Sequence, residues 1–184
     1  MTEIICIVGP SGAGKTTLAK TLSKEREFSF FSVGNLEREI AKQKGYGDVV
    51  EYEKAVGLQK AYVDLFPQVV EELRRIGSKT GGIVVEGVYS PQLYKMIQGT
   101  FGNQNVTLLN ITTGRKTRLR RFVGREKRGI RAAKNNIRGL DRGKFEVGLN
   151  EMMKLGRQNT IKNTGSLEEA MQKIRETLRK TRRL

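Results

Sequence analysis

The sequence predicts an α/β fold in which helices cover both faces of a five-stranded parallel β-sheet. Short apolar runs of strand length alternate along the chain with longer stretches of helical periodicity. One apolar run leads directly into a glycine-rich loop at residues 9–16, and a helical pattern begins directly behind this loop. The chain has 184 residues, which suits one domain with a sizeable core. We therefore expect a single domain over residues 1–184.

The loop at residues 9–16 matches G-x-x-x-x-G-K-[ST] at every fixed position, which is the P-loop sequence. Backbone N–H groups of such a loop converge on phosphate oxygens, and the following helix adds partial positive charge. Lys15 is expected to reach the β- and γ-phosphates, and Thr16 to offer its hydroxyl to Mg²⁺. The expected nucleotide-binding residues of the loop and first turn are Gly9, Ser11, Gly12, Ala13, Gly14, Lys15, Thr16 and Thr17.

The elements before and after the loop follow from their patterns. Residues 4–8 predict a buried parallel strand, and residues 28–32, which are rich in aromatic side chains, predict a second strand. A long helical pattern runs from about 49 to 76, and Gly57 and Pro67 are expected to interrupt it. We expect this pattern to form an inserted helical hairpin within the domain.

The third predicted strand is the apolar run 83–85, which ends in Glu86 at the carboxyl edge of the sheet. Ser90 and Pro91 predict a helix start, with Ser90 as the N-cap and Pro91 in the first turn. Parallel α/β sheets bind ligands at the carboxyl ends of their strands. Glu86 is therefore expected near the ligand.

The last part of the chain predicts two more strands, at residues 105–111 and 159–161. Between them, the stretch 115–131 is so densely basic that it cannot face a core. The final helix is expected to begin at Ser166, because Ser166 and Glu169 have the spacing of a capping box.

The composition favours anionic partners. The chain has 35 Lys and Arg against 19 Asp and Glu, a net charge of +16, which suits nucleotides, phosphorylated metabolites or RNA. A solvated basic surface explains this charge equally well, so an RNA contact stays open. The absence of histidine excludes histidine acid–base chemistry and most transition-metal sites. The single Cys6 is expected to be a buried, inert thiol.

Neither a signal peptide nor a membrane-spanning stretch is recognisable, since the apolar runs have only the length of strands. We expect a soluble cytoplasmic protein with no membrane partner. Its oligomeric state is left open.

Several further motifs resemble those of the adenylate and cytidylate kinase family, over most of the chain. Residues 32–38 resemble the S-T-G-D-x-x-R element, which lines the acceptor nucleotide pocket in that family. The resemblance implies that Gly34 lets the acceptor base approach the backbone and that Arg38 grips the acceptor phosphate. Val33 and Asn35 depart from the threonine and aspartate of the family, which leaves the identity of the acceptor open. An exposed arginine without such a role is the alternative for Arg38.

The strand end Val85-Glu86-Gly87 resembles the family's hydrophobic-acid-glycine element, whose carboxylate orients water around Mg²⁺. The resemblance implies that Glu86 shares the metal with Thr16 and that Glu86 and Gly87 border the acceptor. Alternatively, Glu86 caps the next helix. This strand end also resembles the acid-G-V-R-S motif of archaeal nucleotide kinase relatives, with Tyr89 in place of the arginine.

Arg121 and Arg125 belong to an R-x-x-G-R sequence that resembles the helix leading into the lid of adenylate kinases. The resemblance implies that Arg121 stacks on the donor base and that Arg125 reaches the transferring phosphoryl group. Arg118, Arg138 and Arg142 are weaker candidates for the same cluster. A basic helix that faces nucleic acid is the alternative.

Residues 163–166 resemble the N-x-G-S segment of these kinases and of dephospho-coenzyme A kinase-like proteins, which implies that Asn163 lies near the donor adenine. The resemblance also implies two helical insertions, one for the nucleoside monophosphate at about 35–66 and a lid at about 124–144. Their closure would exclude water from the substrates.

The leading prediction is a kinase with the three-layer P-loop NTPase fold. It would transfer the γ-phosphoryl group of Mg-ATP to a nucleoside monophosphate, AMP or CMP-like, with ATP and Mg²⁺ as cofactors. Lys15, Arg38, Arg121 and Arg125 are expected to be catalytic because they hold and neutralise phosphates. The acceptor phosphate is already anionic, so no general base is required.

Two other functions remain open. A dephospho-coenzyme A kinase-like enzyme would need a base for its hydroxyl acceptor, such as Asp48 or Glu86. An RNA- or ribosome-associated P-loop ATPase would account for the charge of +16.

Overall fold

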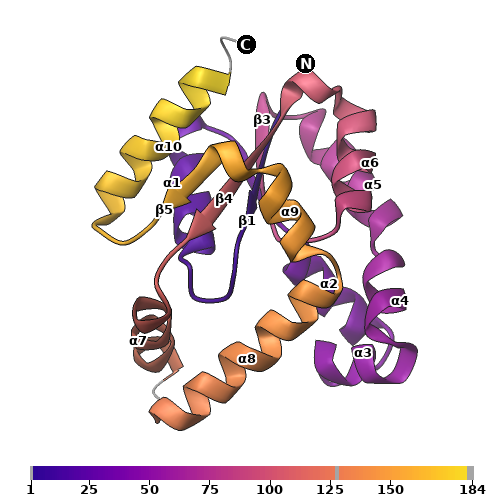
Figure 1. The fold of residues 1–184 in the computed structure, drawn as a ribbon. Coiled ribbons are helices and arrows are strands. Elements are labelled where there is room, and N and C mark those ends of the chain that lie inside the picture. Colours follow the sequence, from indigo (N-terminus) through magenta and orange to yellow (C-terminus); the bar gives the residue numbers. More distant parts are fainter. Residues whose placement is uncertain (1, 127–128, 182–184) are drawn as a thin grey trace.

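A computed structural model describes residues 2–126 and 129–181, apart from the side chains of residues 125 and 126. Its centre is a parallel five-stranded sheet in the order β2-β3-β1-β4-β5 (Figure 1). The strands are β1 (Glu3–Val8), β2 (Ser29–Ser32), β3 (Gly82–Glu86), β4 (Val106–Thr112) and β5 (Thr160–Lys162). The predicted sheet is therefore confirmed, and each strand lies within a residue or two of its expected position.

Ten α-helices and two short 3-10 helices surround the sheet in the described part of the chain. The α-helices are α1 (Lys15–Arg26), α2 (Val33–Gln43), α3 (Val49–Val56), α4 (Leu58–Val63), α5 (Phe66–Gly77), α6 (Pro91–Phe101), α7 (Arg115–Glu126), α8 (Ile130–Glu146), α9 (Leu149–Leu155) and α10 (Leu167–Thr181). The 3-10 helices are η1 (Asn103–Asn105) and η2 (Arg157–Asn159). Among the described residues, no helix has both the length and the apolar character that crossing a membrane requires.

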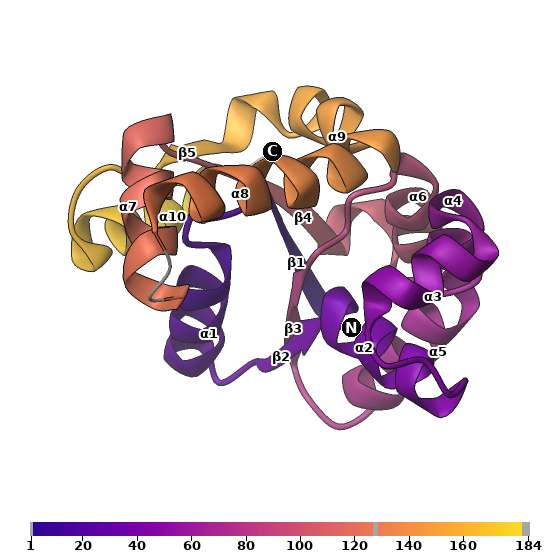
Figure 2. The same cartoon turned by 90° about the horizontal axis from the view of Figure 1, so that it is seen from below.

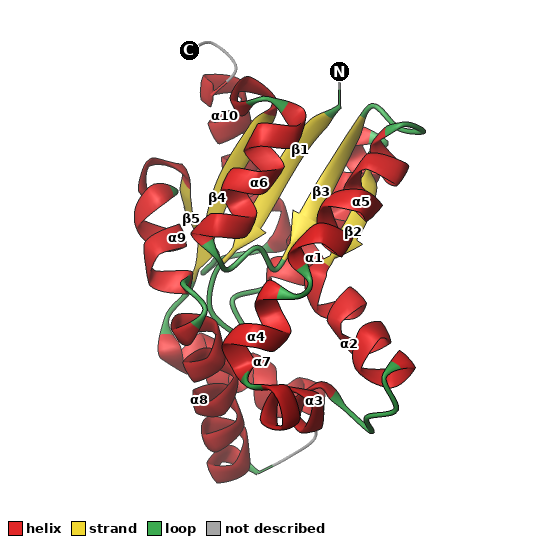
Figure 3. Cartoon of the chain, turned by 90° about the vertical axis from the view of Figure 1, so that its right-hand side faces the viewer, coloured by secondary structure: helices red, strands yellow, loops and turns green. Residues whose placement is uncertain are grey.

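The sheet separates two apolar cores, because successive residues of a strand point to opposite faces. Ile4, Cys6 and Val8 of β1 belong to the core beneath α5, α6 and α9. Ile5 and Ile7 belong to the core beneath α1 and α10. Figure 3 shows α5 and α6 lying across one face of the sheet. Burial raises the pKa of the Cys6 thiol well above its usual range, so the expected inert cysteine is confirmed.

The long helical pattern after residue 48 divides into three helices. Gly57 ends α3 with a φ of 89°, as expected for the predicted interruption. The second break comes before Phe66, so Pro67 lies in the first turn of α5 and begins that helix. The three helices differ in their neighbours, because α5 packs against β3 whereas α3 and α4 pack against each other.

The carboxyl ends of all five strands point to one end of the molecule, where α2, α3, α4, α7 and α8 gather (Figures 1 and 3). Figure 2, seen from this end, shows α8 passing across it between α7 and α9. The predicted helix caps at Ser90 and Ser166 are both present. This arrangement brings basic helices from late in the chain over the loop that follows β1.

Candidate active site

The P-loop connects β1 to α1 through a backbone that only glycine adopts easily. Gly9, Gly12 and Gly14 have φ angles of 145°, 75° and 93°. A Cβ atom on Gly9 would lie 2.1 Å from the carbonyl oxygen of Ile111, and one on Gly14 would lie 2.4 Å from Nδ2 of Asn163. The motif glycines are thus required both by conformation and by close neighbours.

Lys15 and Thr16 occupy the first turn of α1 with different exposure. The Lys15 side chain is buried and donates a hydrogen bond from Nζ to the carbonyl oxygen of Pro10 at 3.1 Å. It is therefore folded back over its own loop, while Thr16 and Thr17 are exposed. In this position the Lys15 ammonium lies beside the loop that is predicted to hold phosphates.

Thr16 and Glu86 meet at the carboxyl edge of the sheet. Glu86 ends β3, which pairs directly with β1, and it accepts a hydrogen bond from Thr16 Oγ1 at 2.8 Å. A hydroxyl and a carboxylate are suitable oxygen ligands for Mg²⁺. In the described part of the chain, no group of three or more acidic, cysteine or histidine side chains is arranged so that it could hold a metal ion. A metal at Thr16 and Glu86 would therefore take its other ligands from phosphate and water.

Arg121 and Asn163 are joined to the same carbonyl group of the loop. Arg121 NH1 donates to the carbonyl oxygen of Ala13 at 3.2 Å, and Asn163 Nδ2 donates to this oxygen at 2.8 Å. Arg121 NH2 also donates to the carbonyl oxygen of Asn163 at 3.3 Å. Two residues predicted to lie near the donor base are thus brought together. The backbone of Arg125 belongs to α7, but its side chain lies outside the described residues.

The backbone N–H and carbonyl groups of Ser11 are each held by a side chain, one from α8 and one from α7. The Ser11 N–H donates to Asp141 Oδ1 at 2.8 Å, and its carbonyl oxygen accepts from Arg118 Nε at 2.6 Å. Arg118 and Asp141 also form an ion pair, with side chains 15% and 11% exposed. This network anchors α7 and α8 on the P-loop.

Lys144 is a second contact from α8 to the loop. Its Nζ donates to Ser11 Oγ at 2.6 Å and lies 5.3 Å from the centre of the Tyr89 ring. Burial and the nearby Lys15 ammonium lower the pKa of Lys144 to about 7. The sequence analysis missed Lys144 and Asp141, since neither belongs to a motif of recognisable spacing.

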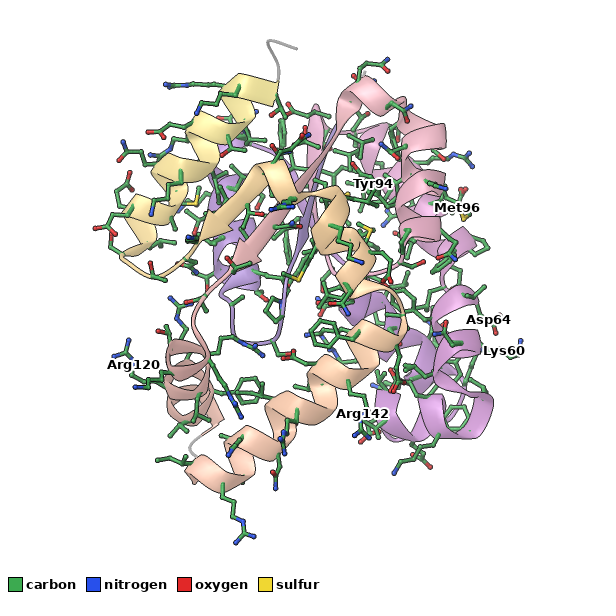
Figure 4. The ribbon with its side chains drawn as sticks, in the orientation of Figure 1. Lys60, Asp64, Tyr94, Met96, Arg120 and Arg142 are labelled. Atoms are coloured by element: carbon green, nitrogen blue, oxygen red, sulfur yellow. The ribbon has the colours of Figure 1, made fainter. Side chains whose placement is uncertain are left out.

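Arg138 and Arg142 lie on α8. Both are exposed and line a groove of about 920 Å³ between α7 and α8. Arg115 and Lys134 contribute further positive charge to the groove, and Leu119, Ile137 and Phe145 contribute apolar surface. Figure 4 labels Arg142 on α8 and Arg120 on α7. Arg118 and Asp141, which are bonded to Ser11, line the same groove.

The predicted acceptor residues lie on α2 and at the end of β3. A Cβ atom on Gly87 would lie 3.4 Å from Cβ of Val33, so the two segments are in close contact. Tyr62 of α4 ties the insert to this edge, because its hydroxyl donates to the Gly87 carbonyl at 2.8 Å and accepts from the Tyr89 N–H at 2.9 Å. Gly34 lies close to the end of β3, since the same Cβ atom on Gly87 would lie 3.7 Å from its backbone nitrogen, and its role beside the acceptor stays a prediction.

Arg38 and Glu37 are neighbours on α2 with different surroundings. The Arg38 side chain is exposed and donates a hydrogen bond to Oδ1 of Asn35. Glu37 faces inward, and burial together with the Glu53 carboxylate raises its pKa to about 7, although Arg38 opposes this shift. Arg38 is therefore free of the protein core and available to a ligand, whereas Glu37 is a costly buried acid.

Comparisons with known proteins agree with this architecture. The family described as AAA domain (AAA_18) matches residues 5–141. A UPF0200 protein from Pyrococcus horikoshii is 30% identical over 182 residues, which cover 96% of both chains. A cytidylate kinase from Sulfurisphaera tokodaii is 33% identical over 94 residues, which cover 51% of this chain and 50% of that protein.

Two solved structures are similar over nearly their whole length. A gluconokinase from Sinorhizobium meliloti has a TM-score of 0.66 at 11% identity and covers 98% of this chain and 94% of its own. A shikimate kinase from Bacteroides thetaiotaomicron has a TM-score of 0.59 at 16% identity, with 96% of this chain and 98% of its own covered. At these identities the similarity establishes the fold alone.

Proposed function

Because the chain belongs to the AAA domain family (AAA_18) and to the UPF0200 family, and has the fold of P-loop kinases, we propose that it is an ATP-dependent kinase. It transfers the γ-phosphoryl group of Mg-ATP to a nucleoside monophosphate, AMP or CMP-like. The observation that carries this proposal is the meeting of Thr16 and Glu86 at the mouth of a complete P-loop.

On the donor side, the glycine-rich backbone binds the phosphates and Lys15 neutralises their charge. Arg121 and Asn163, both bonded to Ala13, form one wall of the site for the donor base. Thr16 and Glu86 would hold Mg²⁺, and the bound ion would neutralise phosphate charge. The donor set of one hydroxyl and one carboxylate fits this ion, since Mg²⁺ retains several waters.

On the acceptor side, we assign the insert at about 35–66, which includes most of α2 and all of α3 and α4, to the nucleoside monophosphate. Gly34 and Gly87 form the floor beside the end of β3, and the exposed Arg38 binds the acceptor phosphate. The bond between the γ-phosphorus and the β,γ-bridging oxygen breaks, while an acceptor phosphate oxygen forms the new bond. No proton has to move, because that oxygen is already anionic.

The lid at about 124–144 covers the donor. Arg118 and Asp141 support this role because they fix α7 and α8 against Ser11. Arg125 remains a proposed phosphoryl contact on the strength of its motif alone. Exclusion of water by lid and insert would suppress hydrolysis of ATP.

The proposal is tested by a coupled assay of Mg-ATP consumption with AMP, CMP, UMP, GMP, dTMP or dephospho-coenzyme A, and with RNA or no acceptor. We expect one nucleoside monophosphate to raise turnover at least about a hundredfold above the level without acceptor. Lys15→Met should abolish this turnover, whereas Lys20→Met, an exposed lysine of the same helix, should not. The proposal is contradicted if no nucleoside monophosphate raises ATP turnover, or if only RNA or dephospho-coenzyme A raises it.

A further inference from the structure

Lys144 lies between the donor loop and the wall of the proposed acceptor site. On one side its ammonium group donates to Ser11 Oγ in the P-loop. On the other side it lies over the ring of Tyr89, which follows the end of β3. The Tyr89 backbone is bonded to Tyr62 of the acceptor insert, so the lysine connects three parts of the site.

The charges around Lys144 are those of a phosphoryl-transfer site. Lys15 of α1 and Arg118 of α7 disfavour its charged form, while Asp141 of α8 and Glu86 of β3 favour it. The Lys144 ammonium thus lies close to the cations of Lys15 and Arg118, where burying a further positive charge is unfavourable in free energy. A bound polyphosphate would offset this cost, because it supplies negative charge where the three cations converge.

Tyr89 gives a second reason for this assignment. Its ring lies 5.3 Å from the ammonium group of Lys144 and attracts this cation. Because Tyr89 follows the end of β3, α8 brings a cation to the strand end beside the P-loop.

We propose that the Lys144 ammonium contacts the γ-phosphoryl group of ATP and stays in contact with this group while it is transferred to the acceptor. This inference rests on the proposed function and assigns a catalytic residue that none of the motifs contains. In the nucleotide complex the Lys144 ammonium exchanges its hydrogen bond with Ser11 Oγ for one with a γ-phosphate oxygen. The Lys144 side chain then stays among the charged groups that already surround it. Arg138 and Arg142 are exposed residues of the groove between α7 and α8, whereas Lys144 is bonded directly to the P-loop.

A lysine that contacts the γ-phosphate distinguishes ATP from ADP. We therefore measure the Kd of Mg-ATP and of Mg-ADP by titration calorimetry without acceptor, for the wild type and Lys144→Met. We expect the substitution to weaken ATP binding about tenfold or more and ADP binding less than about twofold. Lys144→Arg, which keeps a cation, should retain most of the preference for ATP.

The matched control is Lys134→Met, because Lys134 is an exposed lysine of the same helix. This control should change neither Kd. An equal loss of ATP and ADP affinity in Lys144→Met, or no loss of either, overturns the inference. These results are distinct from failure of the proposed function, in which the wild type binds no nucleotide or phosphorylates no monophosphate. Circular dichroism of each variant shows whether its fold is intact.

Discussion

Ser11 and Asp141, which are 130 positions apart in the sequence, are joined by a 2.8 Å hydrogen bond from the Ser11 N–H to Asp141 Oδ1. The same carboxylate forms an ion pair with Arg118, and both side chains are largely removed from solvent. One carboxyl group therefore satisfies a loop amide and a buried guanidinium group together.

We expect Asp141→Ala to destabilise the fold by about 3 kcal/mol, because it leaves the Arg118 charge buried without its partner. The free energy of unfolding is measured by urea denaturation. Glu72→Ala is the control, since Glu72 pairs with Arg75 on the exposed face of α5 and solvent screens that pair. The double variant Arg118→Met/Asp141→Leu should recover much of the loss. If Asp141→Ala lowered the free energy of unfolding as little as the control Glu72→Ala, the result would contradict this prediction.

Glu86→Gln should weaken the binding of Mg²⁺ at the edge of the sheet. The amide keeps a hydrogen bond with Thr16 but loses the negative charge that favours the cation. We expect kcat to fall about a hundredfold and the Mg²⁺ concentration for half-maximal turnover to rise. Glu3→Gln is the control at the opposite end of the sheet, where Glu3 pairs with Arg26. An unchanged Mg²⁺ titration would exclude Glu86 from the metal site.

Much of this site was predictable because local sequence determines it. The P-loop motif encodes its own backbone, as the close contacts at Gly9 and Gly14 demonstrate. The strand pattern predicted Glu86 at the carboxyl edge of the sheet, and the family resemblance implied its place beside Thr16; the pairing of β1 with β3 brings the two together. The capping spacing at Ser166 likewise depends on residues within one turn.

The lid contacts could not be predicted in the same way. Lys144 and Asp141 reach Ser11 only because α8 crosses the end of the sheet, and no local pattern specifies that crossing. The apolar stripe of α8 is weak, with Ala133 the buried apolar residue within it. Of the three weaker arginine candidates, Arg118 is bonded to Ser11, whereas Arg138 and Arg142 are exposed residues of the groove.

Arg121→Ala should weaken the binding of ATP without weakening the binding of the acceptor. Arg121 joins the carbonyl groups of Ala13 and Asn163, so its loss removes one wall of the proposed base site. We expect the KM for ATP to rise about tenfold, with the KM for the acceptor within about twofold of the wild type. Arg120→Ala is the control, because Arg120 points away from the body of the molecule on the same helix (Figure 4). Equal effects of the two variants would show that only net charge matters.

Glu37 exemplifies a position where the fold carries an unfavourable group. Val33 and Ala41, one turn to either side on α2, are each 1% exposed, so helical periodicity calls for an apolar residue between them. Instead, Oε1 of Glu37 is buried with no hydrogen-bond partner among the described residues. A buried acid with a raised pKa must reduce stability at neutral pH.

We therefore expect Glu37→Leu to stabilise the protein at pH 8 and to have a smaller effect at pH 4. Since the folded pKa is about 7 against an ordinary 4.5, the folded state retains the proton between these values while the unfolded state releases it. The wild type thus loses stability as the pH rises through this window, by an amount on the order of 1 to 3 kcal/mol. Thermal unfolding of Glu37→Leu, Glu37→Gln and the exposed control Glu39→Gln, followed from pH 4 to 8, measures the difference. A stability gap between wild type and Glu37→Gln that stays constant with pH would show that the Glu37 carboxyl ionises as freely in the folded protein as in the unfolded chain.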